Sequence, residues 1–232
     1  MLSSTVENYL KQLYLEQRSS DERDVIPTGR LAAVMGVVPG TATSMVKALA
    51  DSGLVEYESR AGVRLTSRGE QHALHVLRRH RLVELFLVKV LGLDWSEVHE
   101  EAEALEHAVS DRVIERMDAL LGHPTADPHG DPIPTGKGHM EEPHRTSLAD
   151  CAMDTAQRVT RVVDQEPEFL RFAERQGLMP GATVAVESRE MVAQAVQIRV
   201  NKRESASLGL AAAAKILVEP VRKGTLPNPG KR

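Results

Sequence analysis

Apolar residues in the first third of the chain recur at the three- and four-residue spacing of short amphipathic helices. Helices are predicted at the N-terminus, over Thr28 to Met35 and over about Gly40 to Asp51, with a break at Gly36 to Pro39. The N-terminal helix has an apolar face formed by Val6, Leu10, Leu13 and Tyr14. Two short helices joined by a tight break are typical of a helix-turn-helix.

The second helix of this pair has one apolar face and one short polar face. The apolar face comprises Ala42, Met45, Val46 and Leu49. The polar face, which a recognition helix presents to phosphates and base edges, comprises Thr41, Thr43, Ser44 and Lys47. The next segment, LVEYESRAGVRLT, predicts two strands around a turn at Ala61 and Gly62. This wing offers Arg60 and Arg64 to the DNA backbone or minor groove, so the pattern predicts a winged helix.

Two further helices are predicted beyond the wing. The first, EQHALHVLRRHRLVELFLVKVLGL, has the apolar positions Ala73, Leu74, Leu77, Leu82, Leu85 and Phe86. The second begins with VHEEAEALEH, residues 98–107, and its apolar spacing comes from Val98, Ala102, Leu105 and Val109. Its donor side chains His99, Glu103, Glu106 and His107 fall at roughly 0°, 40°, −20° and 80° around the helix axis. They form one stripe beside the apolar face.

This stripe of donors is open to two interpretations, a solvated acidic face or a metal site. The preceding helix carries His80 and Glu84 one turn apart. Facing helices that each offer such pairs are the arrangement by which a helical bundle builds a metal site. The second pair therefore favours the metal site.

Composition and charge limit the class of protein. With 232 residues, 41% of them hydrophobic, the chain is long enough for two or three small domains. Its single cysteine, Cys151, excludes an internal disulfide and fits a reducing compartment. Because the chain lacks a long apolar run and a signal-peptide pattern, we expect a cytoplasmic protein with no membrane partner. The net charge of −4 argues against nucleic-acid binding over the whole surface and leaves a local DNA-binding surface open.

The helical pattern of the first half of the chain ends at residues 122–147. This stretch, GHPTADPHGDPIPTGKGHMEEPHRTS, is rich in proline, glycine and histidine, which predicts a linker without a core of its own. Beyond it, TAQRVTRVV, GATVAVESRE and AVQIRVNKRE predict strands of a small β-barrel, with one helix near Pro167 to Gln176.

The run RRHRLVE, then VHEEAEALEHAVSD and HPTADPHGDPIP, behind a winged helix, resembles the diphtheria toxin repressor family of metal-dependent transcriptional regulators. The resemblance covers essentially the whole chain and is closest to the manganese-responsive branch. It implies a mainly α fold with small β elements. The implied parts are a winged helix-turn-helix over 1–71, a helical dimerisation and metal-binding domain over 72–140, a linker over 141–150, an SH3-like β-barrel domain over 151–220 and a disordered tail over 221–232.

Carried over position by position, the resemblance implies two metal sites. The activating site comprises Asn8, Glu103, Glu106 and His107. The second site comprises His80, Glu84, His99 and, from the third domain, Glu166. A further ligand position of that domain is held here by Phe169, which cannot bind metal, so that Glu168, Gln165 or water would replace it.

Two departures bear on the choice of metal. Iron-responsive members carry a cysteine and a methionine at the positions of Glu103 and Asn8, so the harder donors of this chain favour Mn(II) over Fe(II) or another divalent transition metal. Manganese-type members usually have a carboxylate where Asn8 stands. Lys11 occupies the position of a further acidic ligand in short manganese regulators, so we do not expect their paired-metal arrangement here.

The function implied is a non-enzymatic one, a homodimeric repressor of manganese homeostasis genes that binds palindromic double-stranded DNA operators with Mn(II) as corepressor. Without metal, we expect Glu84, Glu103 and Glu106 to repel one another and to leave the first helix loosely held. Three alternatives stay open: an iron-dependent repressor of the same family, a metal-dependent hydrolase, and a DNA-binding module gated by an organic ligand.

Overall fold

The computed structural model describes residues 2–19, 25–141, 146–201 and 205–221. They form two compact units. Unit 1 consists of Met1–Gly92, His99–Thr125 and Pro132–Glu141, and unit 2 of Leu93–Val98, Ala126–Asp131 and Glu142–Arg232. The expected boundary at residue 71 lies within a continuous helix, and the finer division of unit 1 into two domains stays a prediction. Residues 142–145 of the predicted linker and 222–232 of the predicted tail lie outside the described residues.

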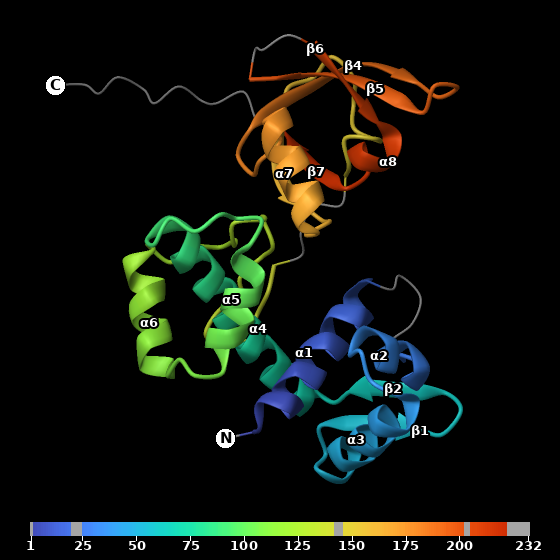
Figure 1. The fold of residues 1–232 in the computed structure, drawn as a ribbon, viewed down its shortest axis with the longest axis vertical. Coiled ribbons are helices and arrows are strands. Elements are labelled where there is room, and N and C mark those ends of the chain that lie inside the picture. Colours follow the sequence, from blue (N-terminus) through green and yellow to red (C-terminus); the bar gives the residue numbers. More distant parts are fainter. Residues whose placement is uncertain (1, 20–24, 142–145, 202–204, 222–232) are drawn as a thin grey trace, which may run out of the picture. The chain divides into compact units, whose positions relative to one another are not determined.

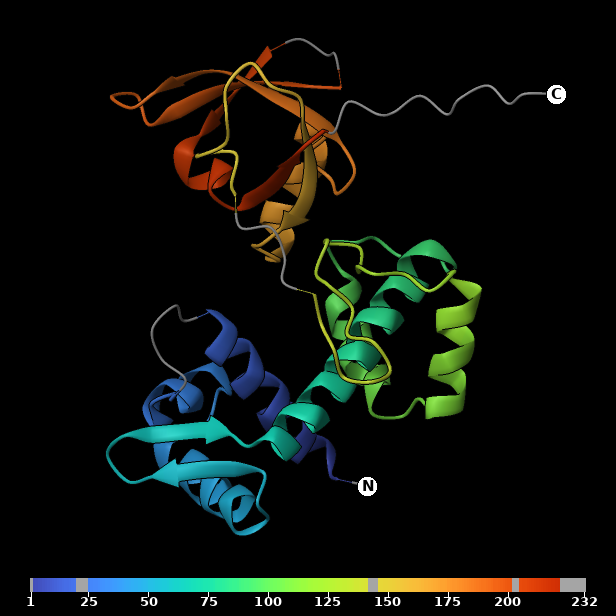
Figure 2. The ribbon, with the colours of Figure 1, turned by 180° about the vertical axis from the view of Figure 1, so that it is seen from behind.

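Unit 1 begins with the winged helix that the sequence predicts (Figures 1 and 2). Its elements are α1 (Ser4–Ser19), α2 (Thr28–Val34), α3 (Pro39–Asp51), β1 (Val55–Glu58) and β2 (Gly62–Leu65). The chain bends by 110° between α2 and α3, which is within the range of angles between the two helices of helix-turn-helix motifs. No single helix in the described part of the chain is long and apolar enough to cross a membrane, and only α2 and α3 taken together, with the bend between them, have that length and apolar content.

Local sequence explains where α3 begins and ends. Pro39 stands in its first turn, where the missing N–H has no helical partner to lose. Gly53 adopts φ 70°, the left-handed conformation that stops a helix. Leu10 and Leu49 are buried in the winged-helix core as expected, and Leu31 of α2 is buried with them. Val6 and Met45, also expected on the apolar faces, are only half-buried at its margin.

The long helix α4 (Ser67–Lys89) leads from the wing into the helical part of unit 1. The side chain of Thr66 caps it by accepting a hydrogen bond from Gly69 N at 3.1 Å. Every residue from 76 to 85 is buried, so α4 runs through the interior with polar as well as apolar side chains enclosed. Two shorter helices follow, α5 (Val98–Glu106) and α6 (Asp111–Leu120), and α6 was not predicted.

The prediction of a coreless linker over 122–147 is wrong for its described part. Within unit 1, Ile133 is buried, and the carbonyls of Pro132 and Pro134 accept hydrogen bonds from Arg81 and Arg78 of α4. Proline has no N–H to satisfy, and the arginines supply donors for its carbonyls. A segment with the composition of a linker is thereby packed along α4.

Unit 2 contains an antiparallel five-stranded sheet in the order β6-β5-β4-β3-β7, with α7 beside β7 (Figures 1 and 2). The predicted elements are present as β3 (Gln157–Val162), α7 (Pro167–Gln176), β4 (Thr183–Glu190) and β5 (Ala195–Val200). The sequence did not predict β6 (Ser205–Gly209), α8 (Leu210–Ala213) or β7 (Ile216–Pro220).

The expected β-barrel is not closed. Its sheet ends at β6 and β7, which are not paired with each other in the described residues. The outer edge of β7 is instead covered by residues 146–148, since Leu148 N donates to Ile216 O at 2.9 Å and Val218 N to Thr146 O at 2.8 Å. A short segment therefore protects this edge from pairing with another chain.

Candidate metal centre

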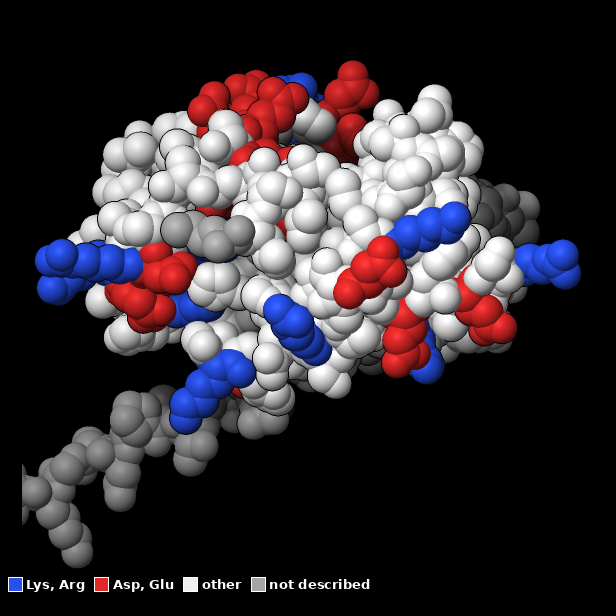
Figure 3. Space-filling view, turned by 90° about the horizontal axis from the view of Figure 1, so that it is seen from below, with Lys and Arg blue, Asp and Glu red and all other residues white. Residues whose placement is uncertain are grey.

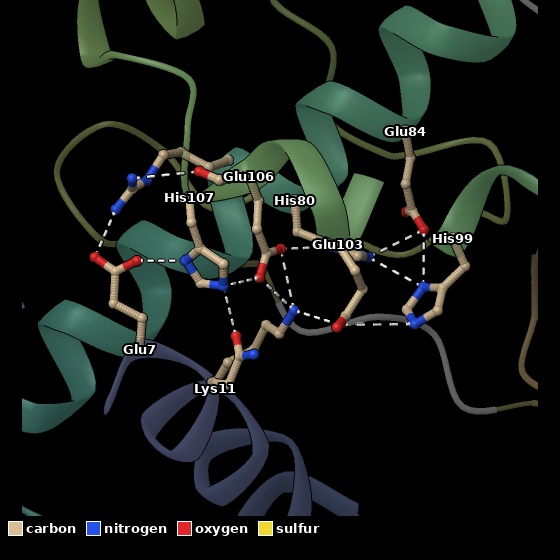
Figure 4. Close-up of polar contacts among 10 residues, drawn as sticks. Glu7, Lys11, His80, Glu84, His99, Glu103, Glu106 and His107 are labelled. Carbon is tan, nitrogen blue, oxygen red and sulfur yellow. Dashed lines mark hydrogen bonds and ion pairs between the residues drawn. The ribbon is translucent and has the colours of Figure 1, made fainter. Parts of the chain in front are cut away.

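Ten polar side chains from α1, α4 and α5 converge within unit 1 (Figure 4). They are Glu7, Asn8 and Lys11 of α1, Arg79, His80 and Glu84 of α4, and His99, Glu103, Glu106 and His107 at α5. They include seven of the eight metal ligands expected from the sequence. Glu166, the eighth, belongs to unit 2, and its role as a ligand stays a prediction.

α5 turns its donor stripe into the cluster because Val98 and Ala102 are fully buried beside it. Leu105, expected in the same apolar stripe, is instead 38% exposed. The stripe is not a solvated acidic face at its inner end, because Glu106 is 0% exposed. Such a carboxylate is enclosed only when cations or donors compensate its charge.

His80, Glu84 and His99, three of the residues expected in the second site, lie together. Glu84 Oε1 lies 3.1 Å from His80 Nε2 and 3.2 Å from His99 Nδ1, and the two ring nitrogens are 3.2 Å apart. One donor atom from each could therefore face a common ion. Carboxylate and imidazole donors suit divalent transition metals.

Asn8, Glu106 and His107, expected in the activating site, form a second group. His107 Nε2 lies 2.7 Å from Asn8 Oδ1 and 3.2 Å from Glu106 Oε1. Glu103, the fourth expected member, is linked to Glu106 through Lys11, whose Nζ is 2.8 Å from a carboxylate oxygen of each. These donors carry oxygen and nitrogen and no sulfur, which suits Mn(II) or Fe(II).

His80 connects the two groups, a link that the sequence did not predict. Its Nδ1 lies 2.6 Å from Glu106 Oε2, while its Nε2 faces Glu84. Burial lowers the pKa of His80, but hydrogen bonds to Glu106 and Glu84 outweigh it and raise that pKa to about 9. For Glu106, burial raises the pKa of the carboxyl group. The interactions of this carboxylate with His80 and Lys11 outweigh the effect of burial, so that its pKa is lowered.

These cations correct the expected state of the metal-free cluster. Glu103 and Glu106 were predicted to repel each other and to leave α1 loosely held. Instead, Lys11 of α1 binds both carboxylates, and His80 binds Glu106 and Glu84. α1 is therefore joined to α5 by ion pairs that involve only the chain's own side chains.

Sequence reasoning missed two contributors, Glu7 and Arg79. Glu7 Oε2 lies 2.6 Å from His107 Nδ1, and Arg79 donates to Glu7 Oε1 at 3.0 Å. A carboxylate that orients a histidine through its second ring nitrogen is common around metal ligands. Glu7 directly precedes the expected ligand Asn8 in α1. The charged neighbours of an expected ligand were therefore the feature of the sequence that could have identified Glu7.

The expected DNA-binding side chains lie on α3 and the wing. Thr41, Ser44 and Lys47 are exposed, whereas Thr43 is half-buried. The hydroxyls of Thr43 and Ser44 donate to Pro39 O at 2.8 Å and Gly40 O at 3.0 Å, which leaves their oxygens as acceptors.

The two wing arginines differ in their surroundings. Arg60 is exposed at the turn with φ 91°, whereas Arg64 Nε lies 2.6 Å from Glu56 on the paired strand. In the face drawn in Figure 3, Lys and Arg side chains are scattered in small groups, with acidic side chains among them.

Family models match three parts of the chain. Residues 1–63 match "Iron dependent repressor, N-terminal DNA binding domain", and residues 66–135 match "Iron dependent repressor, metal binding and dimerisation domain". Residues 146–220 match "FeoA domain". The iron-dependent repressor IdeR of Mycobacterium leprae (strain TN) is 30% identical over 200 residues, which cover 81% of this chain and 85% of the relative.

Solved structures are similar over nearly the whole chain. One described as "Manganese-dependent transcriptional repressor complex with manganese" has a TM-score of 0.84 and 39% identity, covering 93% of this chain and 100% of the other. The manganese regulator SloR has a TM-score of 0.72 and 33% identity, with 93% and 98% coverage. The similarity therefore extends through both units.

Proposed function

The chain belongs to the iron-dependent repressor family, and from this premise we propose that it is a Mn(II)-activated repressor of manganese homeostasis genes. The hydrolase alternative is set aside, because this is a family of transcriptional repressors. The observation that carries the proposal is the donor set of oxygen and nitrogen atoms shared between α1, which packs in the winged helix, and α5.

In this proposal the activating site is formed by Asn8, Glu103, Glu106 and His107. When bound, Mn(II) supplies two positive charges to neutralise Glu103 and Glu106. Asn8 ties the occupied site to α1, and α1 packs against α2, α4 and β2 of the winged helix. Metal occupancy would thereby replace the ion pairs of Lys11 by ligation through Asn8, and this change of attachment would set the position of α1 and with it of the recognition helix α3.

A second site is proposed at His80, Glu84 and His99, with Glu166 as its further ligand. Its support is the short separation of the three donors in unit 1, and the part of Glu166 stays a prediction from the sequence. Because His80 also binds Glu106, occupancy of this site would change the charge next to the activating site.

We propose that the chain acts on DNA as a homodimer that binds palindromic operators. Support comes from the matched dimerisation model and from the exposed apolar side chains Leu105, Val113 and Leu120 on α5 and α6. A two-fold dimer presents two α3 helices, and palindromic half-sites roughly 34 Å apart, or a multiple of that spacing, would match them.

Iron is the nearest alternative corepressor, and the relatives include both iron-named and manganese-named proteins. Mn(II) is favoured because Glu103 and Asn8 are hard oxygen donors. The test is fluorescence anisotropy on DNA from upstream of manganese and iron transporter genes, with Mn(II), with anaerobic Fe(II) and with chelator. We expect binding with Mn(II) at concentrations where Fe(II) fails. Binding that survives the chelator would refute the proposal.

A pair of variants tests the ligand assignment in the same assay. Glu103→Ala should abolish Mn(II)-dependent DNA binding while the protein remains a folded dimer, because the activating site loses a charged donor. Glu101→Ala is the matched control, since Glu101 is exposed on the same helix. Full Mn(II) activation of Glu103→Ala would show that Glu103 is not a ligand.

A further inference from the structure

A buried ammonium group lies at the centre of the activating site. The side chain of Lys11 is 3% exposed, and its Nζ lies 2.8 Å from Glu103 Oε1 and 2.8 and 3.0 Å from the two carboxylate oxygens of Glu106. An ammonium is expensive to bury unless anions surround it, and these two carboxylates meet that need. Lys11 thus satisfies the same oxygens that the proposed metal would use.

The oxygens cannot serve both cations at once. Each oxygen of Glu106 faces Lys11 Nζ and one imidazole nitrogen, His107 Nε2 at Oε1 and His80 Nδ1 at Oε2. Since a carboxylate oxygen has two lone pairs, a divalent ion bound by Glu106 must displace one of these partners. Like charges also repel strongly at such short range in a buried setting. The ammonium must therefore withdraw from between the carboxylates before they can hold a divalent ion.

We propose that Lys11 is an internal competitor for the metal, which occupies the carboxylates of Glu103 and Glu106 in the metal-free protein and sets the affinity for Mn(II). This inference rests on the proposed function and adds to it a residue that controls the response threshold. Activation becomes an exchange of one cation for another. The ion pairs of Lys11 hold α1 against α5 before the exchange, and Asn8 holds it afterwards.

The competition predicts tighter metal binding when the ammonium is removed. Lys11→Met keeps much of the side-chain length and apolar stem while deleting the charge. Lys89→Met is the matched control, because Lys89 is exposed at the end of α4. The free Mn(II) signal in electron paramagnetic resonance gives affinity and stoichiometry for each full-length protein. We expect Lys11→Met to bind Mn(II) at least tenfold more tightly than the wild type, and Lys89→Met to be unchanged.

Each result of this titration has a defined meaning. Unchanged or weaker binding by folded Lys11→Met overturns the competition, whereas failure of the wild type to bind Mn(II) refutes the proposed function itself. If Lys11→Met does not fold, Lys11→Gln takes its place, because the amide keeps a hydrogen-bond donor without the charge. The same increase in affinity is expected for it, and its absence counts equally against the proposal.

The exchange can also be tested on the wild-type protein alone. Reductive methylation followed by mass spectrometry reports how accessible each lysine amine is. Lys11 should react at least tenfold faster with saturating Mn(II) than in chelator, because its amine must leave the enclosed carboxylates. Lys89 should react at one rate in both conditions. Protection of Lys11 that is unchanged when Mn(II) is bound would contradict the exchange.

Discussion

At the scale of single residues, the orientation of His107 depends on Glu7. The Nδ1–H of His107 donates to Glu7 Oε2, and Arg79 holds the other oxygen of Glu7. Nε2 is then the ring nitrogen that faces Asn8 Oδ1 and Glu106 Oε1. Glu7 thus acts as a positioning residue for a proposed ligand.

Replacing the Glu7 carboxylate should weaken metal binding without removing a ligand. Glu7→Gln keeps the size of the side chain but loses the charge that orients His107 and pairs with Arg79. We expect the Mn(II) affinity to fall by roughly 10- to 100-fold, measured from the free Mn(II) resonance. Glu101→Gln, an exposed change on α5, should leave the affinity unaltered. Equal affinities for both variants would contradict this role for Glu7.

The buried imidazole of His80 predicts how the stability of the metal-free protein varies with pH. Its pKa is raised from 6.5 to about 9 in the folded protein. A raised pKa contributes stability that is fully present below about pH 6.5 and is lost as the pH rises through about 9. We expect the free energy of unfolding by urea, in chelator, to fall by on the order of 1–3 kcal/mol over this interval.

Two histidine variants distinguish the contribution of His80 to this pH dependence from the contributions of other groups. His80→Gln should remove most of the fall in stability between the two pH values. His75→Gln should retain it, because His75 is exposed beside Asp111. A pH dependence that persists in His80→Gln would assign the effect to other groups.

At the scale of elements, the start of α4 is pressed against the chain that enters the wing. A Cβ on Gly69 would lie 2.0 Å from the backbone oxygen of Leu54. The same carbonyl accepts a hydrogen bond from Thr66 N at 3.1 Å, so the contact couples the capped end of α4 to the hairpin. Only glycine allows this approach.

Gly69→Ala should therefore destabilise the winged helix by on the order of 3 kcal/mol or more, because backbone must shift to admit a methyl group. Gly29→Ala is the matched control, since nothing lies within 4 Å of its added Cβ and Gly29 is within α2. That control should be neutral or stabilising by about 0.5–1 kcal/mol. Thermal and urea unfolding measure both, and equal stabilities would refute the steric argument.

The wing makes a second prediction at this scale. Arg60 is exposed at the turn, so Arg60→Ala should weaken binding to every DNA sequence alike and lower the slope of log affinity against log salt by about 1. Arg116→Ala, an exposed change on α6, removes the same net charge away from the wing and should leave the slope unchanged. Anisotropy titrations over a range of salt would expose any sequence-selective loss, which would contradict a phosphate contact.

At the scale of the whole molecule, the net charge of −4 works against association with DNA. The cations expected to contact DNA are the exposed side chains Lys47 of α3 and Arg60 of the wing, and their role stays a prediction. The overall charge of such a protein therefore contributes little non-specific affinity for DNA. Placement of the recognition helices then matters more, which suits the proposed control through the attachment of α1.

The sequence by itself determined the elements whose signals are local. The apolar spacing that includes Leu10 and Leu49, and the break at Gly36 to Pro39, predict the winged helix, because amphipathic periodicity and turn residues act over a few positions. The same periodicity placed the donors of VHEEAEALEH on one stripe. α6, β6 and β7 escaped prediction, because their stability depends on packing against distant elements.

Only the tertiary structure decided how the donors are paired and charged. His80 and Glu106 are 26 residues apart in the chain, and Lys11 and Glu106 are 95 apart. Which carboxylate meets which cation depends on how α1, α4 and α5 pack, and no local pattern encodes it. The proline-rich segment illustrates the same limit, since its carbonyls are satisfied by arginines of α4. Burial and long-range electrostatics are properties of the folded chain, because they exist only when distant segments exclude water together.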